Sequence, residues 1–300
     1  MNQKAYWIWL NRIPGIGPKT IAKLLEKLQT PENIWNQTED SLIKIEGIGH
    51  MLAQQILDKT YRIGNESYLE NMQKQQIEMI TIQDKQYPNV LRNIYDSPIC
   101  LFVKGNKELL QKPALAIVGC RQASSYGERI AQYFAYHIAK ENVVIISGMA
   151  KGIDAASHKG ALKAGGSTIA VLGSGPDVIY PKENEILYQT ILAKNGLILS
   201  EYLPGTPPCK LHFPQRNRII SALAQGLLVV EAKKKSGTWI SVDFALEQGK
   251  EIFAIPGNVD NPNAEGTNEL IKQGAICVTC LEDILPQKQV KKDKSDQVTE

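Results

Sequence analysis

The sequence predicts an α/β protein in which a doubly wound, mostly parallel sheet follows a small all-α domain. From residue 114 onward, six continuous apolar runs alternate with amphipathic stretches, and a parallel sheet covered by helices on both faces produces this pattern. A Gly-Ile-Gly sequence occurs twice before residue 60, each time ahead of a helical stretch. At 300 residues and 43% hydrophobic content, the chain can form one large and one small domain.

The helical domain is expected over residues 1–65. Its two repeats are Pro14 to Gly17 followed by TIAKLLEKL, and Glu46 to Gly49 followed by MLAQQIL. They resemble paired helix-hairpin-helix motifs of a SAM-like domain, in which glycines allow tight turns and expose backbone N–H groups to a phosphate. A compact packing domain whose glycines only terminate helices explains the pattern equally well, and both interpretations stay open.

An extended Rossmann-like domain is expected over residues 66–286. Short β-type runs with Tyr-Pro and Ser-Pro turn signals between residues 77 and 105 predict extra strands that lead into the main sheet. Residues 287–300 are polar and charged with no apolar period, which predicts a disordered tail. The six main strands are expected at ALAIVG, VVIIS, STIAVLG, LILS, LLVVEA and EIFAIPG.

Composition says more about the cellular compartment of the protein than about its binding partner. The net charge of +3, from 34 basic and 31 acidic residues, does not by itself indicate a polyanion partner. The N-terminus resembles neither a signal peptide nor a membrane span, and the odd, scattered set of five cysteines argues against a secreted disulfide framework. We therefore expect a cytoplasmic protein. Cys277 and Cys280 form a CxxC without a second pair, so a buried strand-end cysteine and a loop cysteine are expected there.

The loop at 119–127 follows the first main strand, and ligands of open α/β sheets bind beyond the carboxyl ends of strands. Arg121, Ser124 and Ser125 lie in this loop. Small hydroxyl residues, free amides and a fixed positive charge predict an anion site. Arg121 replaces the second glycine of a dinucleotide fingerprint, and the second strand does not end in a ribose-binding acid. These departures argue against a nicotinamide dinucleotide, and no cofactor is expected.

Further loops add cations and one aromatic ring to the same sheet edge. Lys151 lies in SGMAKGID, Lys182 follows Tyr180-Pro181, and Lys210 precedes Phe213. Phe213 is expected either as a core aromatic or as a platform on which a base stacks. Asp154 and His158 are interpreted as a cap of the next helix, through Ala155 and Ala156, and a neighbouring surface or core histidine.

The segment from Pro214 to Arg218 is expected to open a helix, with Arg216, Asn217 and Arg218 in its first turn. Cations at a helix N-terminus cost stability unless anions or acidic partners offset them. Burial of either arginine in an internal salt bridge is the open alternative. No metal set, no Ser/His/Asp arrangement and no paired catalytic carboxylates emerge from these loops, so we expect a groove that binds without reacting and not an enzyme.

Motifs spread over about two thirds of the chain resemble those of the DNA processing protein A family (DprA, also called Smf). The most specific are SGMAKGID at 147–154 and FPQRNRIISAL at 213–223. The others are GCRQASSYG at 119–127, Tyr-Pro at 180–181, Ser-Glu at 200–201, VVEA with SGT at 229–238, PGN at 256–258 and EGTNELIKQGA at 265–275.

The resemblance implies sequence-independent binding and protection of single-stranded DNA, with loading of the RecA recombinase onto incoming DNA during natural transformation. It also implies self-association as a homodimer, for which Leu270 and Ile271 are candidate interface residues. By matching motif positions, it implies DNA contacts by Arg121, Lys151, Lys182, Lys210 and Phe213, supported by Ser124, Ser125, Arg216, Asn217 and Arg218.

The alternative is an enzyme of the lysine-decarboxylase-like family of nucleoside-monophosphate phosphoribohydrolases. Members of that family share a Rossmann-like sheet and carry a PGGxGT loop. Here the corresponding stretch, Lys235 to Thr238, lacks the PGG, and Ile240 to Val242 stand where a glutamate is expected.

Overall fold

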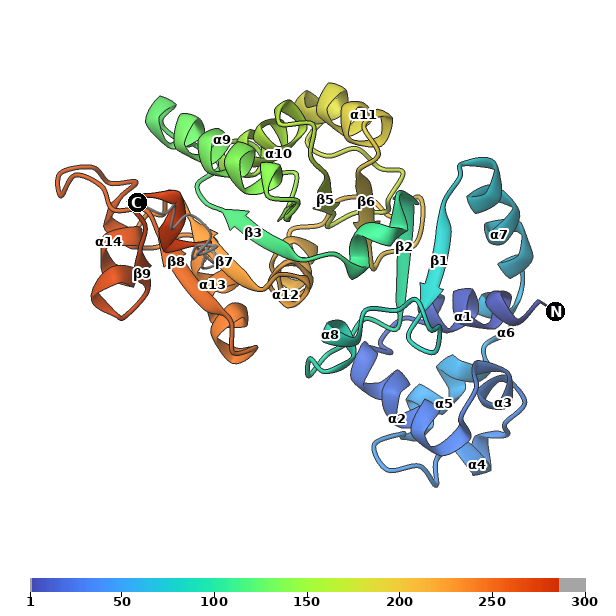
Figure 1. Ribbon diagram of the computed structural model, residues 1–300. Helices are drawn as coiled ribbons and strands as arrows, with labels where there is room; N and C mark the ends of the chain where they lie inside the picture. The colour runs from blue at the N-terminus through green and yellow to red at the C-terminus, as the bar shows by residue number, and fades with distance from the viewer. Residues whose placement is uncertain (1, 286–300) are drawn as a thin grey trace, which may run out of the picture.

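The computed structural model describes residues 2–285 around a nine-stranded sheet of order β1-β2-β6-β5-β4-β3-β7-β8-β9 (Figure 1). Strands β3 to β9 run parallel, and β1 and β2 add an antiparallel edge beside β6. The six predicted apolar runs form β3 to β8, which confirms the predicted fold class. The strands are β1 (Glu78–Thr81), β2 (Cys100–Gly105), β3 (Ala114–Val118), β4 (Val144–Ser147), β5 (Thr168–Val171), β6 (Leu197–Ser200), β7 (Gly226–Val229), β8 (Glu251–Ala254) and β9 (Ile276–Cys277).

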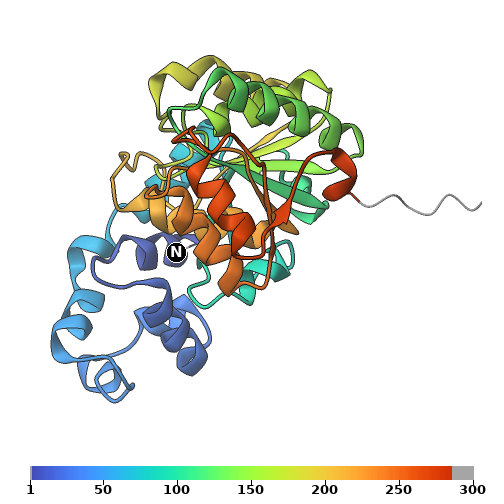
Figure 2. The same cartoon turned by 90° about the vertical axis from the view of Figure 1, so that its left-hand side faces the viewer.

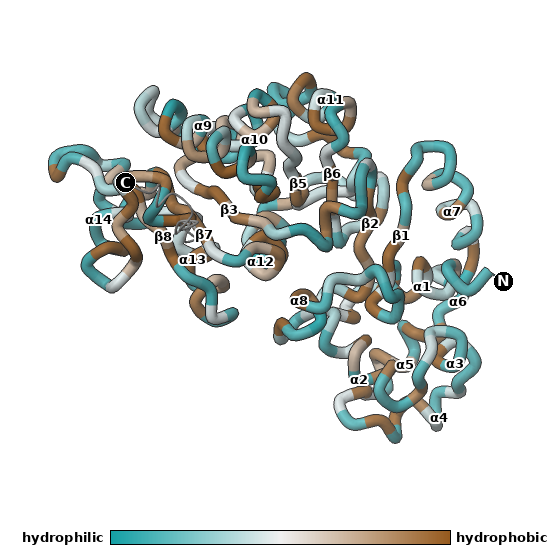
Figure 3. The backbone as a smooth tube through the Cα atoms, viewed as in Figure 1, coloured by the Kyte–Doolittle hydropathy of each residue, from teal (hydrophilic) through white to brown (hydrophobic). Residues whose placement is uncertain are grey.

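Helices cover both faces of the sheet, which explains why the strands are apolar throughout (Figure 3). Leu115 and Ile117 of β3 pack towards α9, whereas Ala116 and Val118 pack towards α12 and α13. One layer contains α9 (Ser125–Lys140), α10 (Ile153–Lys163) and α11 (Glu185–Ala193), and the other α12 (His212–Leu223), α13 (Thr238–Glu247) and α14 (Glu265–Lys272).

The order of the strands changes direction at β3, whose two neighbours in the sheet are β4 and β7. From β3 the strands run through β4, β5 and β6 to one side, and through β7, β8 and β9 to the other. The connections leaving β3 and β7 therefore diverge and leave a crevice at the carboxyl ends of these strands. This topological switch point is the ligand-binding position of open α/β sheets.

The N-terminal helices lie at the antiparallel end of the sheet (Figure 1). Gly15 and Gly47 adopt positive φ values of 76° and 87°, and Gly17 and Gly49 then cap helices with φ values of −88° and −87°. The two repeats thus share one turn geometry, as helix-hairpin-helix motifs require. The helices are α1 (Gln3–Arg12), α2 (Pro18–Leu28), α3 (Pro31–Trp35), α4 (Glu39–Leu42), α5 (His50–Leu57), α6 (Lys59–Arg62) and α7 (Asn65–Lys74).

One apolar cluster joins these helices to the sheet. Trp9 and Leu24 share it with Met79 of β1 and Phe102 of β2. Helix α7 packs against α1, so the helical packing continues past residue 65, where the sequence placed the domain boundary. The remaining short elements are α8 (Asn89–Arg92) and the 3₁₀ helices η1 (Lys107–Gln111), η2 (Lys182–Asn184) and η3 (Leu281–Asp283).

The C-terminal strand β9 differs from the expectation. Cys277 and Cys280 are both exposed, because β9 is a two-residue edge strand, so the expectation of a buried strand-end cysteine was wrong.

Between residues 2 and 285, no cluster of three or more metal-ligating side chains occurs, and no helix has the length and apolarity needed to cross a membrane. The tail predicted at 287–300 lies outside the described residues.

Candidate nucleic-acid interface

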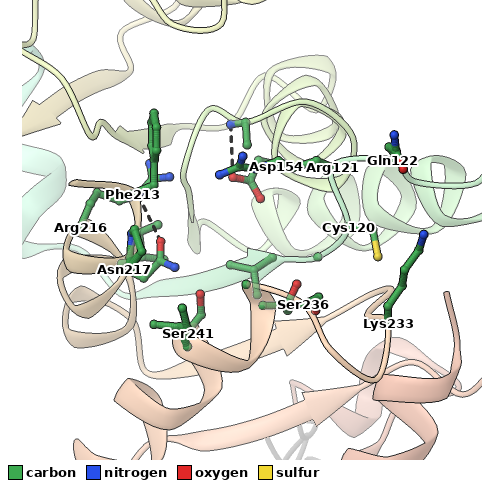
Figure 4. Close-up of a pocket in the computed structure, with 18 residues that line it drawn as sticks. Cys120, Arg121, Gln122, Asp154, Phe213, Arg216, Asn217, Lys233, Ser236 and Ser241 are labelled. Atoms are coloured by element: carbon green, nitrogen blue, oxygen red, sulfur yellow. Dashed lines mark hydrogen bonds between the residues drawn. The ribbon is translucent and has the colours of Figure 1, made fainter. Parts of the chain in front are cut away.

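A cavity of about 500 Å³ opens at the switch point between β3 and β7 (Figure 4). Its walls come from the loop after β3, the loop after β7, and the first turns of α12 and α13. Among the predicted DNA contacts, those that line it are Arg121, Phe213, Arg216 and Asn217. Four of the predicted residues therefore lie together at the carboxyl edge of the sheet.

Aromatic rings and a cation converge at the mouth of this cavity. Phe213 is half-buried, and its ring stacks on Tyr180 with centroids 5.4 Å apart and an interplanar angle of 29°. The guanidinium carbon of Arg121 lies 5.4 Å from the centroid of the Phe213 ring. Tyr180 is 45% exposed. We call Tyr180, Phe213 and Arg121 the aromatic platform; it offers ring surface and positive charge side by side, as base stacking with phosphate contact requires.

Arg216 forms the floor behind the platform and is only 4% exposed. Its Nη1 donates to the carbonyl oxygen of Gly148 at 2.5 Å and to that of Val171. Burial lowers the pKa of Arg216 to about 10, so the guanidinium is still charged at neutral pH. A side chain at Gly148 would place its Cβ 2.6 Å from this guanidinium, so any larger residue there would have to displace Arg216 from its two carbonyl partners.

Arg218 is 3% exposed and held by acids. Its Nη1 and Nη2 lie 2.7 and 2.6 Å from the two carboxylate oxygens of Glu201, and its Nε lies 3.0 Å from Asp96 Oδ2. The internal salt bridge left open by the sequence is therefore present, and direct DNA contact by Arg218 is corrected to a structural role. Since α12 begins at His212, residues 216–218 lie in its second turn and not, as expected, in its first.

The two predicted serines have different surroundings. Ser124 caps α9: its Oγ accepts from Gly127 N at 3.0 Å and donates to the buried carboxylate of Glu231. The Ser124 backbone N–H also donates to Glu231, at 2.9 Å. Ser124 is thus committed to the shape of the loop that carries Arg121, whereas Ser125 is exposed at the start of α9.

Three predicted lysines are exposed but do not line the cavity. Lys151 forms an ion pair with Glu183, a residue of η2 next to Lys182. The η2 segment is tied to the loop after β4 because Asn184 Nδ2 donates to the carbonyl oxygen of Met149 at 2.8 Å. Lys210 stands in the turn before α12. Their contact with DNA stays a prediction.

Asp154 and His158 do not form an acid–base pair. Asp154 Oδ2 accepts from Ala150 N at 3.2 Å, so it stabilises the preceding turn and not, as expected, the helix amides at 155 and 156. His158 Nδ1 lies 2.7 Å from Thr168 Oγ1, and burial lowers its pKa to about 3. The imidazole is therefore neutral near pH 7, which confirms the interpretation as a core histidine.

The cavity also contains polar residues that the sequence analysis did not assign to the site. The backbone N–H groups at the start of α13 have no side-chain cap, because Gly237 precedes the helix. Such groups attract anions. The SGT motif marked this turn, but only tertiary structure brings it opposite Arg121. The residues missed are Gln122, Lys233, Ser236, Thr238 and Ser241.

The candidate dimer residues lie on α14. Leu270 is 4% exposed and belongs to the main apolar core, so it cannot offer its side chain to a partner, and that expectation is corrected. Ile271 is partly buried against the same core. Ile276 on β9 is more accessible, at 38% exposed.

Comparisons with known proteins match both parts of the chain. The family model of DNA recombination-mediator protein A matches residues 78–289, and that of the SAM-like helix-hairpin-helix tandem matches residues 10–59. The DNA processing protein DprA of Streptococcus pneumoniae is 46% identical over 211 residues, which cover 70% of this chain and 74% of that protein. Protein Smf of Synechocystis is 35% identical over 95% of this chain and 72% of its own length.

Solved structures agree with these matches. The X-ray structure of DprA from Streptococcus pneumoniae has a TM-score of 0.81 at 38% identity, and the match covers 95% of this chain and 98% of that chain. DNA processing protein A from Helicobacter pylori, described for its single-stranded DNA binding mode, has a TM-score of 0.62 at 31% identity over 70% of this chain and 94% of its own. The chain belongs to the DNA recombination-mediator protein A family.

Proposed function

We propose that this protein binds single-stranded DNA without sequence preference, along the carboxyl edge of its sheet, and catalyses no reaction. The aromatic platform carries the proposal, because Tyr180 and Phe213 present ring surface next to the cation of Arg121. Stacking on aromatic rings tolerates every base, since each base has a π-face. The likeness to the Helicobacter pylori protein, described for single-stranded DNA binding, supports it.

Phosphates have their own positions around the platform. Arg121 and Lys233 line the cavity together with the uncapped start of α13. Lys151, Lys182 and Lys210 stand exposed on the surrounding loops. Each phosphate contact contributes a salt slope of about −0.7 for a single strand. Duplex DNA keeps its bases stacked inside, so a site that needs free base faces prefers single strands.

The test is a gel-shift series with oligothymidine and duplex DNA. Arg121→Ala and Lys210→Ala should each weaken retention of the single strand while leaving the thermal unfolding midpoint unchanged, because both side chains are exposed. Lys112→Ala is a matched control, since Lys112 is exposed at the opposite, amino edge of the sheet just before β3. Unchanged affinity in both site variants, or equal loss in the control, would contradict the proposed site.

The same preparations test the enzymatic alternative. Incubation with AMP should release no adenine, because the chain lacks the PGG and the glutamate of the phosphoribohydrolase loop at 235–242. Turnover of AMP would overturn the proposal of binding alone.

Protection of incoming DNA, loading of RecA during natural transformation, a cytoplasmic location and homodimerisation complete the proposal. Membership of the DNA recombination-mediator protein A family supports this part of the proposal. RecA assembly on long single-stranded DNA, followed with and without this protein, tests the loading step. The expected result is faster nucleation with the unaltered protein than with the Arg121→Ala variant.

A further inference from the structure

The outer face of α9 carries a row of aromatic and basic residues. Tyr126 and Tyr133 are 46% and 50% exposed. They are seven residues apart, so they lie on the same face of the helix, two turns from each other. The same face continues with Arg129, three residues after Tyr126, and with Tyr136 and Lys140, three and seven residues after Tyr133. With His137 these residues form what we call the α9 stripe: Tyr126, Arg129, Tyr133, Tyr136, His137 and Lys140.

The rings of the α9 stripe are arranged in series. The centroids of Tyr133 and His137 are 4.5 Å apart, and those of His137 and Tyr136 are 5.1 Å apart. Lys140 Nζ lies 5.6 Å from the centroid of the Tyr136 ring. Three rings, those of Tyr133, Tyr136 and His137, thus lie between the two cations Arg129 and Lys140.

Packing of α9 does not need this face. The helix is held to the sheet by its opposite side, through Ala131, Phe134, Ala135 and Ile138. Glu128, the single carboxylate within α9, lies in the first turn, where the helix dipole stabilises it. On the outer face the cations are Arg129 and Lys140, and the exposed Glu141 follows Lys140 as the C-cap.

The stripe continues the groove. Helix α9 begins at Ser125, immediately after the loop that places Arg121 over Phe213. Figures 1 and 2 show α9 on the outside of its helical layer. From Tyr126 to Lys140 the helix rises about 21 Å, which matches about six nucleotides of a stacked single strand at 3.4 Å each.

We propose that the α9 stripe is an auxiliary binding surface for single-stranded DNA that leaves the groove, with bases on the tyrosines and phosphates at Arg129 and Lys140. The inference rests on the proposed function of the groove. Single-stranded DNA fits this surface better than a protein partner does, because three tyrosines lie beside two cations and the surface starts at the groove.

Strand length separates the stripe from the groove. Binding is measured by fluorescence anisotropy for oligothymidines of about 4 and about 16 nucleotides, the ends of the usual range of single-strand site sizes. The double variant Tyr126→Ala with Tyr133→Ala should lose about tenfold or more in affinity for the long strand and keep its affinity for the short one. Tyr95→Ala is the matched control, because Tyr95 is 85% exposed but lies beyond α8, in contact with Lys19.

A charge variant gives an independent readout. Arg129→Gln with Lys140→Gln should reduce the salt slope for the long strand by about 1.4, or 0.7 for each lost phosphate contact, and leave the short-strand slope unchanged. Unchanged long-strand affinity in the tyrosine variant and an unchanged slope in the charge variant would overturn the stripe while the groove stands. Failure of the unaltered protein to bind the short strand would instead overturn the groove.

Discussion

Phe213 is the residue whose environment most directly distinguishes stacking from charge. Its ring is partly open, with Tyr180 on it and Arg121 near it. Phe213→Ala removes about 1 to 3 kcal/mol of base stacking but no positive charge. We therefore expect a loss of about fivefold or more in oligothymidine affinity, with a nearly constant slope of log affinity against log salt. A changed slope with unchanged affinity at low salt would contradict the stacking role.

His158 predicts how stability depends on pH. Its pKa is about 3 in the folded protein and about 6.5 in an unfolded chain. Between these values the unfolded chain binds more protons, so His158 stabilises the fold above pH 6.5 and this contribution falls as the pH falls towards 3. The slope contributed approaches about 1.4 kcal/mol per pH unit. Urea unfolding from pH 7 to 4 should show a shallower decline in His158→Gln, and an identical decline would exclude this origin.

At the scale of elements, α9 and α10 pack unusually closely at one glycine. A Cβ built at Gly160 of α10 would lie 2.5 Å from Gln132 O and 2.9 Å from Ala135 Cβ of α9. Alanine within a helix normally gains about 1 kcal/mol over glycine, but overpacking costs about 1 to 3 kcal/mol. Because the main obstacle is backbone, we expect the cost to exceed the gain and Gly160→Ala to lower the free energy of unfolding.

Urea denaturation measures this change. Gly17→Ala is the control, since a Cβ at Gly17 meets nothing within 4 Å and its φ is −88°. A Gly160→Ala variant as stable as the unaltered protein would show that the two helices can separate at no cost.

The sequence was most informative about individual helices and strands. Strands β3 to β8 could be predicted because burial on both faces makes them continuously apolar. The helix-hairpin-helix turns were visible because positive φ selects glycine at positions 15 and 47. By contrast, the two-residue strand β9 is too short to have a pattern, and the length of α7 depended on its packing against α1.

The sequence could assign the candidate residues to one edge of the sheet but could not predict their contacts. Loops after parallel strands share one edge, so Arg121 and Phe213 could be assigned to it. The stack of Tyr180 on Phe213 joins residues 33 positions apart, and the pair of Arg218 with Glu201 joins residues 17 positions apart. Local spacing does not encode such contacts. The sequence therefore could not tell which arginine faces the cavity and which is buried in a salt bridge.

At the scale of the whole molecule, the C-terminal edge of the sheet is where self-association can be tested. β9 is an edge strand, and unpaired edges offer N–H and C=O groups to another chain. Ile276 adds an apolar side chain there that is 38% exposed. If two copies associate through this edge, Ile276→Asp should shift the protein from dimer to monomer in sedimentation velocity. Val259→Asp is the matched control, because Val259 is 94% exposed in a loop.

Loss of the dimer should lower the affinity for long single-stranded DNA in particular. Two grooves on one dimer engage a long strand in succession, and the second binding event then gains from effective concentration. A strand too short to reach both grooves gains nothing. Ile276→Asp should therefore weaken binding to a long oligothymidine by at least about tenfold and leave binding to a short one unchanged. Dissociation to monomers with no change in long-strand affinity would show that the two grooves act independently, whereas a dimer unaffected by Ile276→Asp would place the self-association surface elsewhere.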